Sequence, residues 1–217
     1  MIPMTIQQVA EVTGGVICEG YLEQPITFTE VATDTRKSMK NSLFIALKGD
    51  NFNGNQFVDT AQSQGAVACL LDEDVQSTLP IIKVDNTVKA MGQIASWVRK
   101  QLPLPTIGIT GSSGKTTVKE MLASILECKG QVLATAGNFN NSIGVPLTLF
   151  RLTAEDQYAV VEMGASKVAD IDEIAQLVEP NIAVITNISV AHLQGLGTIE
   201  GIAKVKGELL DHLQENG

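Results

Sequence analysis

One glycine-rich stretch, residues 110–117, constrains the fold more than any other part of the chain. It reads Thr110-Gly111-Ser112-Ser113-Gly114-Lys115-Thr116-Thr117. An apolar run precedes it, and the segment after it carries apolar residues at helical spacing, at Val118, Met121, Leu122 and Ile125. This order predicts a buried strand, a loop and a helix. Backbone N–H groups at a helix start, beside glycines that allow close approach, can bind a polyphosphate.

The side chains of this loop suit nucleotide binding. Lys115 would reach the outer phosphates, and the Thr116 hydroxyl could ligate a magnesium ion. The expected ATP-binding residues are Gly111, Ser112, Ser113, Gly114, Lys115, Thr116 and Thr117. The loop is shorter than the common G-x-x-x-x-G-K-[ST] pattern, because Ile109 stands where that pattern has its first glycine. The alternative is an ordinary strand-to-helix turn, which the strand, both glycines and the Lys-Thr pair disfavour.

Composition excludes several classes of protein. The 217 residues suffice for two modest domains, and the 4% aromatic content suits an aliphatic core between parallel α/β layers. A net charge of −9 argues against a nucleic-acid partner. Cys18, Cys69 and Cys128 lack metal-ligand spacing, which indicates free thiols in a reducing cytoplasm. With neither a signal peptide nor an apolar run of membrane-spanning length, we expect a cytoplasmic protein without membrane insertion.

The sequence divides at a proline-rich junction, residues 102–105. Residues 1–102 alternate short helical and strand-like pieces and are expected to form a small mixed α/β domain. Residues 103–217 alternate strand and helix regularly, which predicts a parallel-sheet ATPase domain of the P-loop type. Its expected strands are 106–110, 132–135, 159–163 and 182–187, with helices near 118–126, 145–150, 170–177 and from 199. The fold class is therefore α/β, and ligands of such sheets bind at the carboxyl ends of the strands.

Three of these strand ends carry polar candidates. Asn138, Asn140 and Asn141 could contact the neutral polar groups of a substrate, or could simply form a turn. Glu162 closes a hydrophobic strand and could hold magnesium, directly or through water; a solvent-exposed carboxylate is the alternative. His192 follows the last strand, in a place where a histidine is more often incidental than a ligand.

The last expected helix carries two lysines that lie on opposite faces, Lys204 and Lys206. At 100° per residue, one face gathers Ile199, Ile202, Ala203, Leu209, Leu210 and Leu213. Lys206 falls in the middle of this face, whereas Lys204 lies on the opposite face with Glu200 and Glu208. An inward-facing amine is costly unless it is paired, deprotonated or modified. The alternative is that Lys206 extends to the surface.

Several stretches, in the same order along the chain, resemble the Mur ligases of peptidoglycan synthesis. The most particular resemblance is to the type that adds D-alanyl-D-alanine to UDP-N-acetylmuramoyl-tripeptide. The stretches that carry it are 33–37, 43–49, 110–117, 137–146, 161–165, 191–197 and 206–209. Together they extend over nearly the whole chain.

The resemblance implies a role for each candidate residue. Thr35 and Arg36 would contact the UDP part of the substrate in the first domain, and Asn138, Asn140 and Asn141 would lie near substrate and nucleotide. The implied catalytic residues are Lys115, His192 and Lys206. The implied magnesium ligands are Thr116, Glu162, His192 and Lys206, the last as a carbamate formed from carbon dioxide.

The implied reaction is ATP- and Mg²⁺-dependent formation of an amide bond through an acyl phosphate, by an acid–D-amino-acid (peptide) ligase. In that family the central domain is longer and a third domain follows it. We therefore expect an N-terminal fragment that is too short to ligate on its own, and that is monomeric. The alternatives are another Mur ligase, a ligase like folylpolyglutamate synthase, and a nucleotide-binding module without catalysis.

Overall fold

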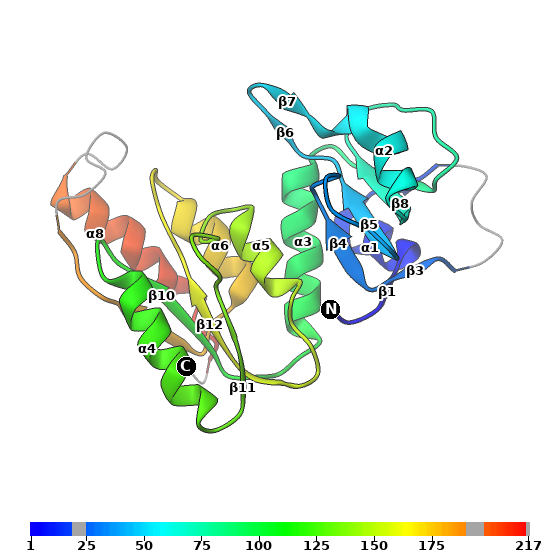
Figure 1. Ribbon diagram of the computed structural model, residues 1–217. Coiled ribbons are helices and arrows are strands. Elements are labelled where there is room, and N and C mark those ends of the chain that lie inside the picture. Colours follow the sequence, from blue (N-terminus) through cyan, green and yellow to red (C-terminus); the bar gives the residue numbers. More distant parts are fainter. Residues whose placement is uncertain (19–24, 190–197, 216–217) are drawn as a thin grey trace. The chain divides into compact units, whose positions relative to one another are not determined.

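The computed structural model describes residues 1–18, 25–189 and 198–215 (Figure 1). The chain forms two compact units, Met1–Trp97 and Val98–Gly217. None of the helices in the described part combines the length and the apolar character that crossing a membrane requires.

The first unit is built on a five-stranded sheet of order β2-β9-β8-β5-β4. Strands β9, β8, β5 and β4 are parallel, and β2 is antiparallel to β9. Two short antiparallel pairs, β1 with β3 and β6 with β7, accompany this sheet. The elements are β1 (Met4–Thr5), α1 (Ile6–Thr13), β2 (Val16–Ile17), β3 (Thr27–Phe28), β4 (Glu30–Ala32), β5 (Ser42–Ile45), β6 (Lys48–Gly49), β7 (Phe52–Asn53), η1 (Gly54–Phe57), α2 (Val58–Ser63), β8 (Ala66–Leu71), β9 (Ile81–Lys83) and α3 (Thr87–Lys100).

Local sequence explains the helix starts in this unit. The Thr5 hydroxyl accepts a hydrogen bond from the Gln8 N–H, and the Gln8 side chain accepts one from the Thr5 N–H, which completes a capping box for α1. Helix α3 begins after Asn86, whose Oδ1 accepts the Lys89 N–H. In both cases a polar side chain just before the helix accepts an N–H group of its first turn.

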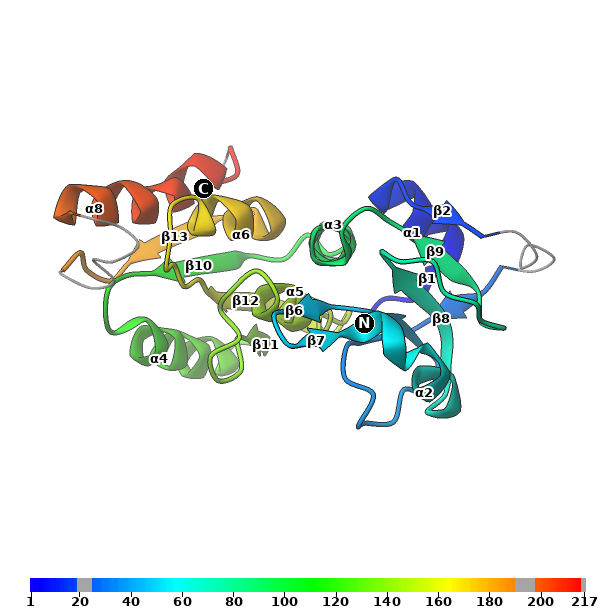
Figure 2. The same cartoon turned by 90° about the horizontal axis from the view of Figure 1, so that it is seen from above.

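The second unit is a four-stranded, all-parallel sheet of order β11-β12-β10-β13. Helix α4 covers one face of this sheet, and α6 and α8 lie on the other (Figure 2). The predicted alternation of strand and helix is confirmed. The elements are β10 (Thr106–Thr110), α4 (Lys115–Glu127), β11 (Gln131–Ala134), α5 (Gly144–Leu149), β12 (Asp156–Glu162), α6 (Asp170–Val178), β13 (Ile182–Ile185), α8 (Ile199–Gly207) and η2 (Glu208–His212).

Helix α4 turns only part of the apolar face given by its residue spacing towards the sheet. Met121 and Ile125, which share the apolar spacing of Val118 and Leu122, are 60% and 62% exposed. Lys119 and Ala123 are the buried residues of this helix. Three further residues pack partly buried against Ile107, Ile109 and Val160 of the sheet, namely Val118, Leu122 and Leu126. An apolar pattern wide enough for two faces does not say which of them meets the sheet.

The last helical segment also differs from its prediction in part. Ile202 and Leu209 are buried as expected, but Ile199 and Leu210 are 48% and 52% exposed. The α-helix ends at Gly207, and the chain continues as the 3-10 segment η2. Projection at 100° per residue fails from there on, because a 3-10 helix turns by about 120° per residue.

The residue before α6, Ala169, has a strained backbone conformation. Ala169 precedes the helix at φ 68, a left-handed conformation that costs an L-residue about 1–2 kcal/mol. Ala169→Gly is therefore expected to raise the free energy of unfolding, by up to about 1 kcal/mol after the extra entropy of unfolded glycine. Ala175→Gly, inside the same helix, is the control with the opposite sign, because there glycine costs about 1 kcal/mol. Urea denaturation measures both; equal losses would contradict the strain argument.

Candidate functional site

Because the four strands of the second unit are parallel, their carboxyl ends lie at one edge of the sheet. The predicted phosphate loop follows β10 at this edge, Thr135 follows β11, Glu162 ends β12, and Thr186 follows β13. The polar residues that sequence places after separate strands are thereby brought together.

The phosphate loop has the conformation of an anion-binding turn before a helix. Gly114 precedes α4 at φ 77, so the helix begins at Lys115. The Lys115 Nζ donates a 2.9 Å hydrogen bond to the carbonyl oxygen of Gly111 and thus curls back over the loop. The helix dipole and the N–H groups of the first turn of α4 favour a negatively charged ligand.

A second loop, residues 186–189, holds the phosphate loop in place. The Ser112 N–H donates to the Asn187 carbonyl at 3.1 Å, and the Ser113 N–H donates to the Asn187 Oδ1 at 3.1 Å. The Thr186 hydroxyl donates to the Ser113 carbonyl at 2.6 Å. No role was predicted for Thr186 and Asn187, although two polar residues directly after an apolar strand could have indicated one.

Glu162 is the most enclosed acid of the site, with 2% of its surface exposed. Its Oε2 accepts the Thr116 hydroxyl at 2.8 Å, and its Oε1 accepts the Asn140 amide at 2.8 Å. The Glu162 N–H donates to the Thr135 hydroxyl at 2.9 Å. Three residues proposed from sequence, Thr116, Asn140 and Glu162, therefore meet at one point.

The donor set at this point fits a magnesium ion. The Thr116 hydroxyl and the Glu162 carboxylate are the hard oxygen ligands that Mg²⁺ prefers, and phosphate oxygens and waters usually supply the remaining positions. Among the described residues, no group of three or more His, Cys, Asp or Glu side chains forms a metal site. One carboxylate with one hydroxyl suits an ion that arrives with a nucleotide rather than one held by the protein alone.

The asparagines of residues 138–141, here called the asparagine loop, have different roles. Asn141 stabilises the start of a helix, whereas Asn140 contacts a residue of the site. The Asn141 Oδ1 accepts the N–H groups of Ile143 and Gly144, at 3.2 and 2.7 Å, and so caps the start of α5. Asn140 reaches Glu162, as described above. Asn138 is exposed, and its carbonyl accepts the Asn140 N–H at 2.8 Å.

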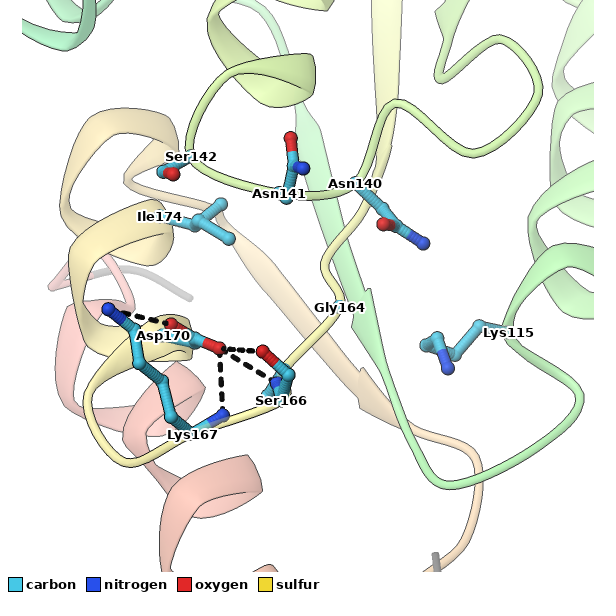
Figure 3. A pocket seen from close by; sticks show the side chains of 10 residues that line it. Lys115, Asn140, Asn141, Ser142, Gly164, Ser166, Lys167, Asp170 and Ile174 are labelled. Carbon is cyan, nitrogen blue, oxygen red and sulfur yellow. Dashed lines mark hydrogen bonds and ion pairs between the residues drawn. The ribbon is translucent and has the colours of Figure 1, made fainter. Parts of the chain in front are cut away.

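A cavity of about 440 Å³ opens between the phosphate loop, the asparagine loop and the start of α6 (Figure 3). Its lining comprises Lys115, Asn140, Asn141, Ser142, Gly164, Ala165, Ser166, Lys167, Asp170 and Ile174. The wall formed by Ser166, Lys167 and Asp170 was not predicted to belong to the site. The Asp170 Oδ2 orders this wall by accepting the N–H groups of Ser166 and Lys167, at 2.7 and 2.9 Å.

Lys206 is buried as the helix projection predicts, with 3% of its surface exposed, whereas Lys204 is exposed. Burial lowers the pKa of the Lys206 amine, and the positive charge of Lys115 lowers it further. The two lysines of the candidate site are therefore close enough to influence each other. His192, the remaining candidate, lies outside the described residues.

Thr35 and Arg36 belong to the first unit, in the loop after β4. Thr35 is half-buried, while the Arg36 side chain is 87% exposed. The Arg36 Nε and Nη2 donate to the two carboxylate oxygens of Asp34, each at 2.8 Å. Hydrogen bonds from Arg36 hold the pKa of Asp34 well below its usual range. Asp34 thus orients a guanidinium that remains open to solvent.

Comparison with known proteins yields two family matches. Residues 109–217 match the Mur ligase middle domain, and residues 27–99 match the Mur ligase family catalytic domain. The UDP-N-acetylmuramoyl-tripeptide--D-alanyl-D-alanine ligase of Escherichia coli (strain K12) is 45% identical over all of this chain, which covers 47% of that protein. The enzyme of the same name from Bacillus subtilis (strain 168) is 42% identical, again over the full chain and 48% of the relative. The chain thus spans about half the length of the curated relatives it matches.

Solved structures agree with these matches. A crystal structure of MurF from Acinetobacter baumannii superposes with a TM-score of 0.92 at 37% identity, over 99% of this chain and 48% of that one. MurF from Thermotoga maritima in complex with ADP superposes with a TM-score of 0.81 at 32% identity, over 86% of this chain and 44% of that one. The α/β fold is that of the MurF structures. The chain belongs to the Mur ligase family.

Proposed function

We propose that this chain is part of an ATP-dependent acid–D-amino-acid (peptide) ligase that adds D-alanyl-D-alanine to UDP-N-acetylmuramoyl-tripeptide. Curated relatives that match the whole chain carry the name of this activity. A structural neighbour holds ADP, which supports the use of ATP. The proposed enzyme acts as a monomer in the bacterial cytoplasm, in line with its free Cys18, Cys69 and Cys128.

The observation that carries the proposal is the meeting of Thr116 with Glu162 beside Lys115, at the end of a phosphate loop. A loop alone would bind a nucleotide. A buried carboxylate fixed against the loop's own threonine adds the means to hold the divalent ion of a nucleotide. Lys115 supplies a cation that can move from the Gly111 carbonyl to phosphate oxygens.

In the proposed reaction the carboxylate of the muramoyl-tripeptide attacks the γ-phosphorus of ATP, which gives an acyl phosphate and ADP. The amine of D-alanyl-D-alanine then attacks the acyl carbon, and inorganic phosphate leaves as the amide forms. Lys115 and the N–H groups at the start of α4 stabilise the negative charge that develops on the transferred phosphoryl group. Bound Mg²⁺ would supply further neutralisation of this charge.

The surroundings of Lys206 support the proposal that its amine forms a carbamate. Only the neutral amine adds to carbon dioxide, and burial beside Lys115 favours that form. The added carboxylate would turn a buried cation into an anionic oxygen ligand, and would thus remove the repulsion from Lys115. We propose that Lys206 carries this group and, with His192, holds a second Mg²⁺.

For the remaining substrate contacts, we propose that Thr35 and Arg36 bind the UDP part. The open guanidinium of Arg36, oriented by Asp34, suits a phosphate oxygen. Asn138, Asn140 and Asn141 are proposed to contact substrate and nucleotide near the cavity that Asn140 and Asn141 line.

The direct test is phosphate release by the full-length protein with ATP and UDP-N-acetylmuramoyl-tripeptide, with and without D-alanyl-D-alanine. We expect release to require the muramoyl substrate and to accelerate strongly when the dipeptide is present, with the amide product seen by mass spectrometry. Phosphate release that is independent of both substrates would contradict the assignment and favour a non-catalytic nucleotide-binding role.

Glu162→Gln tests the metal carboxylate separately. The amide preserves size and can still pair with Thr116, but it lacks the charge that holds a divalent ion. We expect phosphate release to fall by about 100-fold, the scale of losing one electrostatic contact to the reacting group. ADP binding without magnesium should change little. A variant with normal activity at low magnesium would show that Glu162 does not hold the ion.

A further inference from the structure

Lys119 is a fully buried lysine for which the proposed reaction has no use. It lies in the first turns of α4, where it faces the sheet with 1% of its surface exposed. Taking an ammonium group out of water is costly unless the protein replaces its hydrogen bonds. A helix that packs on a sheet needs only an apolar side chain at such a position, so the amine calls for another explanation.

Hydrogen bonds connect the Lys119 amine, through Thr135, with Glu162, the carboxylate proposed to hold magnesium. Its Nζ donates a 2.8 Å hydrogen bond to the carbonyl oxygen of Thr135, directly after β11. Thr135 is itself 2% exposed, and its hydroxyl accepts the Glu162 N–H at 2.9 Å. Thr135 also donates its N–H to the Val160 carbonyl at 3.1 Å, which extends the pairing of β11 with β12. Thr135 thus connects Lys119 with Glu162.

The same helix carries the other proposed magnesium ligand. Thr116 lies one turn before Lys119 on α4, and its hydroxyl donates to the Glu162 carboxylate at 2.8 Å. Helix α4 and the end of β12 are therefore joined twice, once through Thr116 and once through Lys119 and Thr135. Two connections fix the approach of a helix to a strand end better than one, because the first alone leaves rotation about the contact.

Resting on the function proposed above, we infer that Lys119 and Thr135 are positioning residues that set the separation of Thr116 from Glu162 and thereby the affinity for nucleotide-bound divalent metal. Glu120 supplies the counter-charge, since its Oε1 lies 2.6 Å from the Lys119 Nζ. Glu120 is largely exposed, so its contribution is screened by solvent and the hydrogen bond to Thr135 is the essential contact.

The test uses Thr135→Val in the full-length protein, because valine keeps the shape and removes the hydroxyl. Mn²⁺ binding in the presence of ADP is measured by electron paramagnetic resonance. We expect the Mn²⁺ affinity to fall by about 10-fold, at the lower end of the effect of residues that orient metal ligands. Thr135→Ser should restore it. Lys119→Met is expected to act in the same direction, and the Mg²⁺ requirement of phosphate release should rise with little change in the KM for the muramoyl substrate.

The matched control is Thr106→Val. Thr106 is also fully buried, and its hydroxyl also bonds to the backbone, donating to the Leu104 carbonyl at 3.1 Å, but it lies at the opposite end of the sheet. Urea denaturation reports the stability loss of each variant. If Thr106→Val weakens Mn²⁺ binding as much as Thr135→Val does, or if neither changes it, the positioning role is wrong.

Different results would contradict the proposed ligase function and the positioning role of Lys119 and Thr135. A protein that binds Mn²⁺ and ADP with the expected variant pattern, yet releases no phosphate with the muramoyl substrate, would overturn the proposed function and leave the positioning role intact. Normal ligation with unchanged metal binding in Thr135→Val and Lys119→Met would do the reverse.

Discussion

Lys206→Met is expected to abolish ligation while making the protein more stable. Lys206 has 3% of its surface exposed, and burial together with the positive charge of Lys115 lowers the pKa of its amine. Methionine fills similar space without a charge, so the variant loses the desolvation cost and the repulsion from Lys115. We expect a gain on the order of 1 kcal/mol in the free energy of unfolding, and a loss of phosphate release of about 1000-fold or more, the upper range for a group that stabilises transferred charge.

The pH dependence of stability gives this prediction a sign that can be checked. The pKa of Lys206 is lower in the folded protein than its ordinary value of 10.5. Between these two values the unfolded chain binds more protons than the folded one, so the stability of the natural protein rises with pH across that interval. The destabilisation by the charged amine is fully present below the pKa of the folded state and is lost above 10.5. Lys206→Met should lack this rise, which thermal unfolding between neutral and alkaline pH measures.

Lys204→Met is the matched control, because Lys204 lies on the same helix but is exposed. It should change neither stability nor phosphate release appreciably. The unfolding experiments need buffers freed of carbon dioxide, so that the amine of Lys206 is unmodified. If Lys206→Met is less stable than the natural protein under those conditions, the amine makes a favourable contact, and the argument from burial is wrong. Partial recovery of Lys206→Ala activity by short carboxylates would support the carbamate.

The contrast between Lys204 and Lys206 also shows how far sequence reasoning reaches. Helical periodicity placed Lys206 inside and Lys204 outside, because the face around Lys206 is apolar on both sides. Long-range parallel topology likewise placed Thr116 near Glu162, although these residues are far apart in sequence. Both predictions depend on regular geometry, in which position along the chain determines position in space.

Outside this regular geometry, the sequence does not predict contacts that depend on a residue distant along the chain. Lys119 follows Val118 in a helix with apolar residues on two sides, and nothing local shows that its amine meets the Thr135 carbonyl. Met121 and Ile125 continue the helical pattern but lie on the exposed side. The choice of the buried face is made by the sheet surface against which the helix packs, and that surface is assembled from separate strands.

Gly111→Ala is expected to be the most damaging substitution in the phosphate loop. Gly111 has φ 152, and a Cβ atom at this position would overlap the Thr186 hydroxyl and lie 3.1 Å from its Cβ and 3.2 Å from its backbone nitrogen. Thr186 cannot move away freely, since its hydroxyl is bonded to the Ser113 carbonyl and its N–H to the Thr110 carbonyl. We expect a loss of about 3 kcal/mol or more in unfolding free energy, the range of strained core substitutions, together with loss of ADP binding.

Gly114→Ala separates backbone strain from this steric overlap. Gly114 also has a positive φ, of 77, but a Cβ there meets nothing within 4 Å. Its expected cost is therefore the conformational one alone, about 1–2 kcal/mol. Chemical denaturation compares the two variants at equal protein concentration. Equal losses would show that strain, rather than contact with the loop after β13, governs both glycines.

A double-mutant cycle identifies Thr186 as the partner. Thr186→Ala alone should cost about 1 kcal/mol through the lost hydrogen bond to Ser113. In that background Gly111→Ala no longer meets a hydroxyl, so its cost should fall by about 1–2 kcal/mol, within the usual coupling energies of residues in contact. Additive losses would place the strain elsewhere. A reduced loss would show that the loop after β13, and not the glycine-rich sequence by itself, requires glycine at position 111 of the phosphate loop.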